Sequence, residues 1–286
     1  MKFIHELGSI HATAQKLFVS QSAVSHQLAQ LEQYLGLRLF ERTGRTMEIT
    51  SAGQLVYNHA VRLLDGFHQL DVDIGDFKGG NVGQVVAGGS IVPGTYWLPK
   101  LVSAYRQSHP QVNVRLQVLT AVELVKAVIE GCVDFGVTPV RYPDPFLTIN
   151  TLGTEELIIV AAPDIAPQHL PRTQEELLSW DFICAPRETL GRQYLDEVLL
   201  DHGVDKRNIV MEIGHPEGVK RGIQAGLGLG IVHRWSVEDD LDRGTLQSVD
   251  VQGFPLRIPI YIYTRVDRCL SPACQQFIEI LFDEIQ

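Results

Sequence analysis

Cysteine is scarce in this sequence, and long hydrophobic runs are absent. The 286 residues include four cysteines, Cys132, Cys184, Cys269 and Cys274, without CxxC spacing or paired histidines. This argues against a disulfide framework and against a zinc site, and favours reduced thiols over a redox switch. No apolar run reaches the roughly 18 residues that a membrane span needs. Residues 1–9 lack the basic start and apolar middle of a signal peptide. We therefore expect a cytoplasmic protein with no membrane partner.

Motifs that support catalysis are missing as well. The sequence contains no GxSxG, HExxH or P-loop pattern. The glycines Gly226, Gly228 and Gly230 precede a predicted strand, which is the reverse of the order in a dinucleotide-binding fingerprint. The acidic run 238–240 is typical of a solvated surface. We expect no catalytic residue, no cofactor and no metal.

Apolar residues are plentiful, and charge is unevenly distributed. The composition is 45% hydrophobic and 20% charged, which supports packed cores, and the length suits two or three units. Residues 1–50 hold five Lys or Arg against four Asp or Glu, a net charge of +1. The remaining 236 residues carry 19 against 30, a net charge of −11. This division favours a small DNA-reading head on an acidic body.

Two short helices joined by a tight turn are predicted at the start of the chain. Ser9 can cap a helix that ends at Leu17, and Ser20 can cap a second helix that ends at Gly36. The second helix has one apolar stripe at spacings of three and four residues. Two helices in this arrangement form a helix-turn-helix.

A hairpin-like wing and a long helix follow. Residues 37–50 alternate and turn at Thr43–Gly44, with Arg42 and Arg45 near the tip. Residues 51–77 contain no proline, and apolar residues recur alternately every four and three positions. This is the seam of a coiled coil, and it predicts pairing of two subunits; a stripe docked on its own domain is the alternative. The predicted dimerisation residues are Val56, Ala60, Leu63, Phe67, Leu70, Ile74 and Phe77.

The rest of the chain alternates strands with helices, which predicts an α/β body with largely parallel sheets. Residues 78–81 look like a linker. Strands are predicted at 84–91, 112–119, 133–137, 157–162, 182–185, 209–213, 230–232 and 258–264. Helices are predicted at 96–108, 121–130, 193–202, 218–225 and 272–285.

A set of spaced positions in the first 53 residues closely resembles the DNA-binding head of LysR-type transcriptional regulators. These are Gly8 to Ala14, Ser20 to Leu28, Leu31-Glu32, Leu35-Gly36, Leu39 to Arg42, Arg45 and Thr50 to Gly53. The stretches 131–134 and 225–231 resemble the effector domain of that family less specifically. Compared with the family, this chain begins inside the first helix, so we expect a thinner head core or a start codon assigned late.

The resemblance implies the whole architecture. It comprises an N-terminal winged helix-turn-helix, a long dimerisation helix and a C-terminal α/β, two-lobed, periplasmic-binding-protein-like effector domain. We place these parts at residues 1–50, 51–80 and 81–286. Lobe I then covers about 81–156 and 265–286, and lobe II about 163–257, with crossing strands at 157–162 and 258–264. Partners would be double-stranded DNA, a small anionic effector and a second copy in a homodimer or homotetramer.

The resemblance also implies two sets of site residues. The DNA-binding set is Ser20, Gln21, Ser22, Ser25, His26, Gln30, Arg42 and Arg45. Glutamine can pair with adenine edges, whereas capping alone is the alternative for the two leading serines and a solvated surface role for the arginines. The effector set is Ser90, Thr95, Thr120, Thr138, Arg187, His215 and Glu217. Local caps and turns are the alternative for the hydroxyl residues, and Glu217 speaks against a purely anionic site.

The predicted function is sequence-specific DNA binding that a small effector modulates. A solute-binding protein is the alternative, because the cleft domain alone would fit, but it would need an export signal and no helix-turn-helix. The segment 187–192 loosely resembles family members that control carbon-fixation or sulfur genes.

Overall fold

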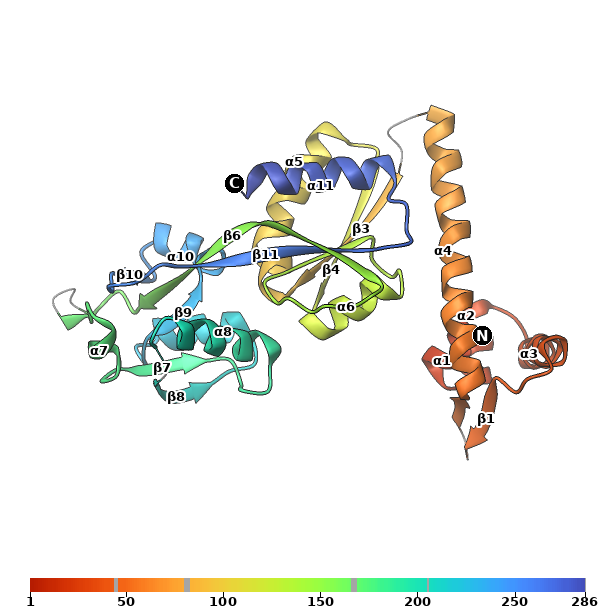
Figure 1. Ribbon diagram of the computed structural model, residues 1–286, viewed down its shortest axis with the longest axis horizontal. Coiled ribbons are helices and arrows are strands. Elements are labelled where there is room, and N and C mark those ends of the chain that lie inside the picture. Colours follow the sequence, from red (N-terminus) through yellow and green to blue (C-terminus); the bar gives the residue numbers. More distant parts are fainter. Residues whose placement is uncertain (44–45, 80–82, 166–168, 205, 286) are drawn as a thin grey trace. The chain divides into compact units, whose positions relative to one another are not determined.

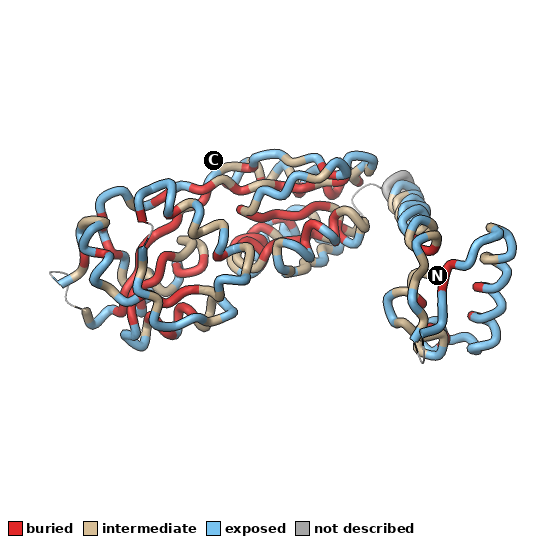
Figure 2. The backbone as a smooth tube through the Cα atoms, turned by 60° about the horizontal axis from the view of Figure 1, so that its bottom comes forward, coloured by how far each residue is buried: buried red, intermediate tan, exposed pale blue. Residues whose placement is uncertain are grey.

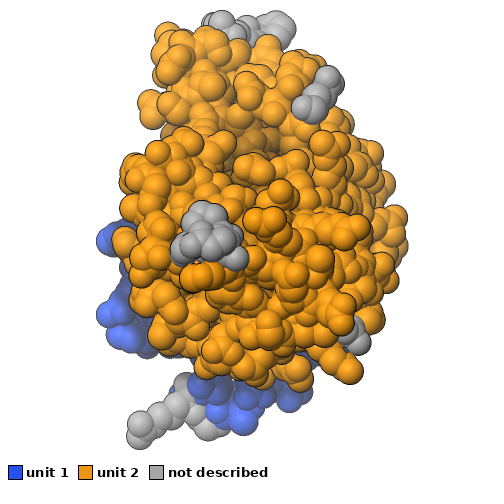
Figure 3. All heavy atoms as spheres, turned by 90° about the vertical axis from the view of Figure 1, so that its left-hand side faces the viewer, with its two compact units in different colours: residues 1–74 blue, residues 75–286 orange. Residues whose placement is uncertain are grey.

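The computed structural model describes residues 1–43, 46–79, 83–165, 169–204 and 206–285. It consists of two compact units, Met1–Ile74 and Gly75–Gln286, which Figure 3 shows in different colours. Among the described residues, no helix is both long and apolar enough to cross a membrane.

The first unit begins with the helices α1 (Lys2–Leu7), α2 (Ile10–Leu17) and α3 (Gln21–Leu35). The Ser9 side chain accepts a hydrogen bond from the Ala12 N–H at the start of α2, and the Ser20 side chain accepts one from the Ala23 N–H at the start of α3. Gly36 ends α3 with a φ of 67°, in the left-handed region that glycine adopts without strain. The structure therefore confirms the helix-turn-helix and its predicted caps.

The wing is a hairpin of β1 (Phe40–Thr43) and β2 (Thr46–Ile49). Its predicted tip residue Arg45 lies outside the described residues. A carboxylate connects the wing to α3, because Glu32 Oε1 accepts hydrogen bonds from the Leu39 N–H at 2.8 Å and the Phe40 N–H at 3.2 Å. The core of this unit is formed by Ile4, Ala14, Val24, Leu28, Leu39 and Phe40.

The helix α4 (Ser51–Gly79) follows, as predicted. The Thr50 hydroxyl accepts a hydrogen bond from the Gly53 N–H at 2.9 Å and donates one to the Arg38 carbonyl at 2.7 Å. The first turns pack on the head, and Val56 contacts its core. Val56 therefore packs on the head, and its assignment to a seam between subunits stays a prediction.

A seven-stranded mixed sheet organises the second unit (Figure 1). Its order is β10-β6-β11-β5-β3-β4, and β9 also pairs with β6. The strands are β3 (Gly83–Ser90), β4 (Val112–Leu119), β5 (Phe135–Thr138), β6 (Leu147–Ala161), β9 (Gly230–His233), β10 (Gln247–Val249) and β11 (Leu256–Arg265). A separate parallel pair is formed by β7 (Asp181–Cys184) and β8 (Asn208–Glu212).

The expectation of largely parallel sheets is wrong. Strands β3, β4 and β5 are parallel, but β11 is antiparallel to both β5 and β6, and β6 is antiparallel to β9 and β10. The reason is topological: β6 carries the chain from one lobe to the other and β11 brings it back, so these neighbours run in opposite directions. Both crossing strands are longer than predicted.

Two lobes lie along these crossing strands. The first lobe contains β3 to β5 with α5 (Leu98–Ser108), α6 (Ala121–Ile129) and α11 (Pro272–Glu284). The second contains β7 to β10 with α7 (Gln174–Leu177), α8 (Leu190–Asp201), α9 (Pro216–Gln224) and α10 (Glu238–Asp242). A π-helical turn, η1 (Pro93–Trp97), leads into α5, and a 3-10 turn, η3 (Arg234–Ser236), follows β9. Buried backbone runs through both lobes along the sheet (Figure 2).

Candidate DNA-binding face and effector cleft

The predicted base-reading residues lie on the exposed side of α3. Val24 and Leu28 are buried toward the head core, whereas all the predicted contacts on this helix are exposed. These exposed residues are Gln21, Ser22, Ser25, His26 and Gln30. Arg42 is also exposed, on β1 of the wing. The geometry leaves a polar helix face open to a partner.

The serines and the glutamine at the start of α3 have defined local partners. Ser20 caps the helix, and its hydroxyl lies 2.9 Å from the Ser22 hydroxyl, so the capping alternative is realised for Ser20. Gln21 Nε2 donates to His11 Nδ1 at 2.5 Å. Sequence reasoning overlooked His11, since a contact across the turn between two helices leaves no periodic signal.

An apolar stripe on α4 is uncovered. Leu63 and Phe67 are each 68% exposed, Leu70 is 51% exposed and Ile74 is 44% exposed. Ala60 is half-buried, and the side chain of Phe77 lies outside the described residues. Burying such a stripe against a second copy would remove four large apolar side chains from water.

Three predicted effector residues gather at one end of the first lobe. The register pairs Ser90 with Leu119, next to Thr120, and Gly89 with Val137, next to Thr138. Parallel strands bring these carboxyl ends together, as in clefts that hold ligands. Ser90 is 7% exposed, and no hydrogen bond of its hydroxyl is found in the described part of the chain. Thr138 is fully buried, and its hydroxyl accepts from the Val140 N–H at 3.2 Å.

The helix that follows β3 starts directly against that strand. A Cβ on Gly89 would lie 2.5 Å from the Gly94 Cα, so only glycine permits this approach. Thr95 is exposed on η1, a π-helical turn, and such turns are frequent at functional sites. The open N–H groups of this helix start lie beside Ser90 in sequence and favour an anion.

Thr120 has a complete local role. Its hydroxyl accepts from the Glu123 N–H, and its own N–H donates to the Glu123 carboxylate at 2.9 Å. The Thr120 N–H and the Thr120 hydroxyl, the latter at 2.7 Å, both donate to the Glu123 carboxylate and lower the pKa of Glu123. The local cap that is the alternative for this hydroxyl residue is therefore present, as a capping box with Glu123.

The predicted residues of the second lobe follow β7 and β8, which are parallel neighbours. Arg187 is exposed, and His215 caps α9 by accepting from the Glu217 N–H at 3.2 Å. The loop that carries Arg187 is anchored by Arg192, which is 2% exposed. Arg192 donates to the Ala185 carbonyl at 2.7 Å and is paired with Asp196 at 2.8 Å. Sequence reasoning began α8 one residue after Arg192 and so missed it.

Glu217 joins the two lobes. The Tyr96 hydroxyl, from η1 in the first lobe, donates to Glu217 Oε1 at 2.6 Å. Lys220 Nζ lies 2.8 Å from the same carboxylate and 2.8 Å from Asp240. Burial acts against it, but the hydrogen bonds from Lys220 and Tyr96 lower the pKa of Glu217 overall. Its predicted contact with an effector thus competes with two partners from the protein.

Two more contacts connect the lobes on the same side. The rings of Trp97 and Trp235 stack with centroids 4.8 Å apart and an interplanar angle of 1°. Lys100 Nζ lies 2.6 Å from Glu238. On β6, the buried Glu155 accepts from the Trp235 N–H at 2.9 Å, and burial raises the pKa of Glu155 to about 7.

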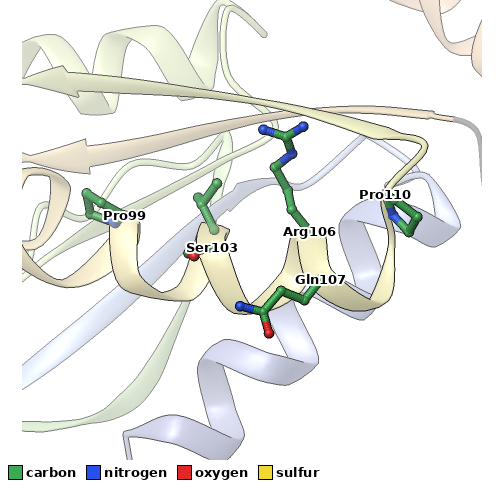
Figure 4. Close-up of a pocket in the computed structure, with 6 residues that line it drawn as sticks. Pro99, Ser103, Arg106, Gln107 and Pro110 are labelled. Carbon is green, nitrogen blue, oxygen red and sulfur yellow. The ribbon is translucent and has the colours of Figure 1, made fainter.

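A groove of about 410 Å³ lies elsewhere, on the outer side of α5 (Figure 4). Its lining is Pro99, Val102, Ser103, Arg106, Gln107 and Pro110. None of these is a predicted effector contact, so the groove and the carboxyl ends of β3 to β5 are different places on the first lobe.

Both parts of the chain match families of known proteins. Residues 2–54 match "Bacterial regulatory helix-turn-helix protein, lysR family", and residues 78–286 match "LysR substrate binding domain". A "Probable RuBisCO transcriptional regulator" of Cyanidioschyzon merolae is 30% identical, over 96% of this chain and 93% of that protein. One of the same name from Synechocystis is 30% identical, over 97% of this chain and 82% of that protein.

Solved structures share the fold. Full-length CbnR in a complex with its target DNA has a TM-score of 0.69 at 22% identity, covering 97% of this chain and 95% of that one. The regulatory domain of Synechocystis CcmR in complex with 2-PG has a TM-score of 0.61 at 19% identity, covering 71% of this chain and 97% of that domain. With both domains matched in the family's order, this chain belongs to the LysR family of DNA-binding transcriptional regulators, which are not enzymes.

Proposed function

We propose that this regulator responds to a small anionic metabolite held between the lobes and controls carbon-fixation genes from the cytoplasm. The relatives named "Probable RuBisCO transcriptional regulator" support the gene class. The solved relatives with 2-PG and with shikimate support a small polar effector. Its domains would divide near residues 50 and 80, and its lobes near the crossing strands.

The observation that carries the effector proposal is Ser90. Ser90 is 7% exposed, and its hydroxyl has no hydrogen-bond partner within the described residues, so its donor and its acceptor capacity are both open to a ligand. It stands at the carboxyl end of β3, directly before a helix start whose open N–H groups suit negative charge. The candidate contacts around it are Thr95, Thr138, Arg187 and His215. Thr120 and Glu217 already hydrogen-bond within the protein, so they can bind the effector only with their remaining donors and acceptors.

A thermal-shift screen of organic acids, phosphates and sulfur oxyanions tests this site. A ligand at 100 times its dissociation constant adds about 2.7 kcal/mol to the free energy of unfolding, which raises the melting temperature visibly. Ser90→Ala should abolish the rise, and Ser103→Ala, on the exposed side of α5, should keep it. Stabilisation by cationic or apolar compounds alone, or an unchanged response of Ser90→Ala, would refute the anion site.

We also propose that the start of α3 reads base edges and that the wing arginines, Arg42 and Arg45, contact phosphates. The support is the open polar face of α3, with Gln21 at its first turn. Pairing of two copies through α4 would place two heads on one operator, and contacts between effector domains would make a tetramer.

Fluorescence anisotropy at several salt concentrations separates these roles. Gln21→Ala should relax the base preference at one position and cost about 1–3 kcal/mol on the preferred site. Arg42→Ala should weaken binding to all sequences alike. It should also reduce the slope of log affinity against log salt concentration by about 1, the value of one phosphate contact. If neither variant alters binding, the assignment of these residues fails, although the family membership stands.

A further inference from the structure

His11 and Gln21 form a contact between the two helices of the DNA-binding motif. His11 lies in the first turn of α2, and Gln21 is the first residue of α3. Both side chains are exposed, yet the Gln21 amide nitrogen lies only 2.5 Å from His11 Nδ1. Among the described residues, Gln21 is the polar contact of His11. His11 therefore holds the amide of Gln21 from a different helix, α2.

The contact fixes which atoms of the amide remain available. A glutamine amide has two N–H donors and one carbonyl acceptor. One N–H is used by His11 Nδ1, which leaves the other N–H and the carbonyl oxygen. That remaining pair matches the acceptor and donor that adenine presents in the major groove. An unrestrained amide could turn over and would also lose side-chain entropy when it binds.

We propose that His11 is a positioning residue that fixes the orientation of the Gln21 amide and thereby sets the base that the head prefers. This inference rests on the proposed role of Gln21 in base reading. His11 itself need not touch the DNA.

The same geometry makes base preference sensitive to the proton on His11. A protonated imidazole donates from both nitrogens and accepts from neither. The amide must then turn its oxygen toward Nδ1 and direct both N–H groups outward, a pattern that suits the acceptors of guanine rather than adenine.

The helices α1 and α3 pack against α2, which carries His11. Most of the charged side chains on these three helices are held in ion pairs. Lys2 and Lys16 each lie 4.0 Å from Glu6, and Glu32 is paired with Arg38. The remaining titratable groups on these helices are His5, whose ring lies edge-on to Tyr57, and the exposed His26 and Tyr34. Because His26 also carries an imidazole, a control must separate it from His11.

Anisotropy with full-length protein tests the inference, using duplexes that the unmodified protein selects from a randomised pool. The base pair at which Gln21→Ala loses preference is first identified, and all four bases are then compared there. At pH 8, His11→Ala should lose about 2- to 10-fold in preference at that same base pair, the immobilisation cost of one flexible side chain. His11→Asn should retain it, because the Asn Oδ1 can accept where Nδ1 does. His59→Asn, on an exposed position of α4, is the matched control and should behave like the unmodified protein.

The pH arm compares pH 8 with pH 5.5. The unmodified protein and His59→Asn should shift preference away from adenine at the lower pH, and His11→Asn should not. A contribution of His26 alters all three proteins alike and cancels in this comparison. Thermal unfolding verifies that each variant folds, which the exposure of His11 favours.

The outcomes are distinguishable. If Gln21→Ala relaxes preference but His11→Ala binds like the unmodified protein, or if His11→Asn follows the same pH shift, the inference on His11 is overturned while the proposed function stands. If Gln21→Ala binds like the unmodified protein, the proposed role of Gln21 fails and the inference fails with it.

Discussion

Replacing Glu155 with glutamine should remove a pH-dependent weakness at the point where the lobes meet. Glu155 is 5% exposed on the crossing strand β6, and it has no ion pair within the described ranges. Its carboxylate accepts a hydrogen bond from the backbone N–H of Trp235. The ring of Trp235 stacks on the ring of Trp97 in the first lobe. Burial raises the pKa of Glu155 to about 7, and the N–H groups of Trp235 and Glu156 offset this only in part.

The sign follows from which state holds the proton. An unfolded glutamic acid titrates near its ordinary value of 4.5, so between about pH 4.5 and 7 the folded state keeps a proton that the unfolded state has lost. The contribution of Glu155 to stability is full below pH 4.5, falls as pH rises through 7 and then levels off. A shift of this size corresponds to about 3 kcal/mol. Glutamine keeps the acceptor for Trp235 without the charge.

Urea unfolding at pH 5, 6, 7 and 8 measures this, with tryptophan fluorescence as the signal. All three tryptophans, Trp97, Trp180 and Trp235, belong to the second unit, so the signal reports that unit alone. Glu155→Gln should be close to the unmodified protein at pH 5 and more stable by up to about 3 kcal/mol at pH 8. A difference that is the same at all four pH values would refute the reasoning.

Two comparisons make the result specific. Glu156→Gln alters the neighbouring carboxylate, which is 28% exposed and lies 2.7 Å from Arg234, and should lose at most about 1 kcal/mol. His233 titrates in the opposite sense: burial lowers its pKa to about 4, so its contribution is present above pH 6.5 and is lost as pH falls through 4. Its effect is common to all variants and cancels in the differences.

Three further outcomes are expected. Leu70→Asp should convert a dimer to a monomer or an insoluble protein in light scattering, because it places a charge in the exposed α4 stripe, whereas Leu55→Asp, exposed but off that seam, should leave the mass unchanged. Arg192→Met should lower the urea midpoint by the equivalent of about 1–3 kcal/mol, since it leaves the Ala185 carbonyl without its donor, whereas the partly exposed Asp196 keeps its ion pair with Arg207; an unchanged midpoint would contradict this. Tyr96→Phe should cost about 1.5–3 kcal/mol in thermal unfolding, the value of a hydrogen bond to the charged Glu217, and a loss below 0.5 kcal/mol would contradict this.

The head was predictable because its determinants are local. The caps at Ser9 and Ser20 and the glycine at Gly36 act within four residues of their helices, so a single pass along the sequence finds them. Strand β4 was predicted at its observed bounds for the same reason, since it lies between clear turn signals. Local chemistry and the final fold agree at these positions.

Several residues of the family pattern support the head through contacts within it. Glu32 binds two N–H groups at the wing, and Thr50 connects the start of α4 to Arg38. A Cβ on Gly53 would lie 2.0 Å from the Leu39 carbonyl oxygen, so this position requires glycine. The resemblance identified the positions, but only the coordinates separate those that hold the scaffold from those that are free to bind.

The candidate effector site was predictable only in part. Parallel strand ends follow from the alternation of strands and helices, and they place Ser90, Thr120 and Thr138 at one edge. The bridge between Tyr96 and Glu217 joins residues 121 positions apart, and no periodicity reports such a pair. The first half of β6 was missed because its outward positions are exposed and polar, so it lacks the continuous apolar run of its second half.

One helical segment connects the candidate effector site to the contacts between the lobes. The segment from η1 through α5 begins beside Ser90 and carries Thr95, a candidate contact of the effector. The same segment supplies Tyr96, Trp97 and Lys100, which contact Glu217, Trp235 and Glu238 of the second lobe. A ligand that moves this segment must also act on the three contacts, and one that binds without moving it leaves them unchanged. An effector can therefore shift the arrangement of the lobes only by as much as its affinity differs between the conformations of this segment.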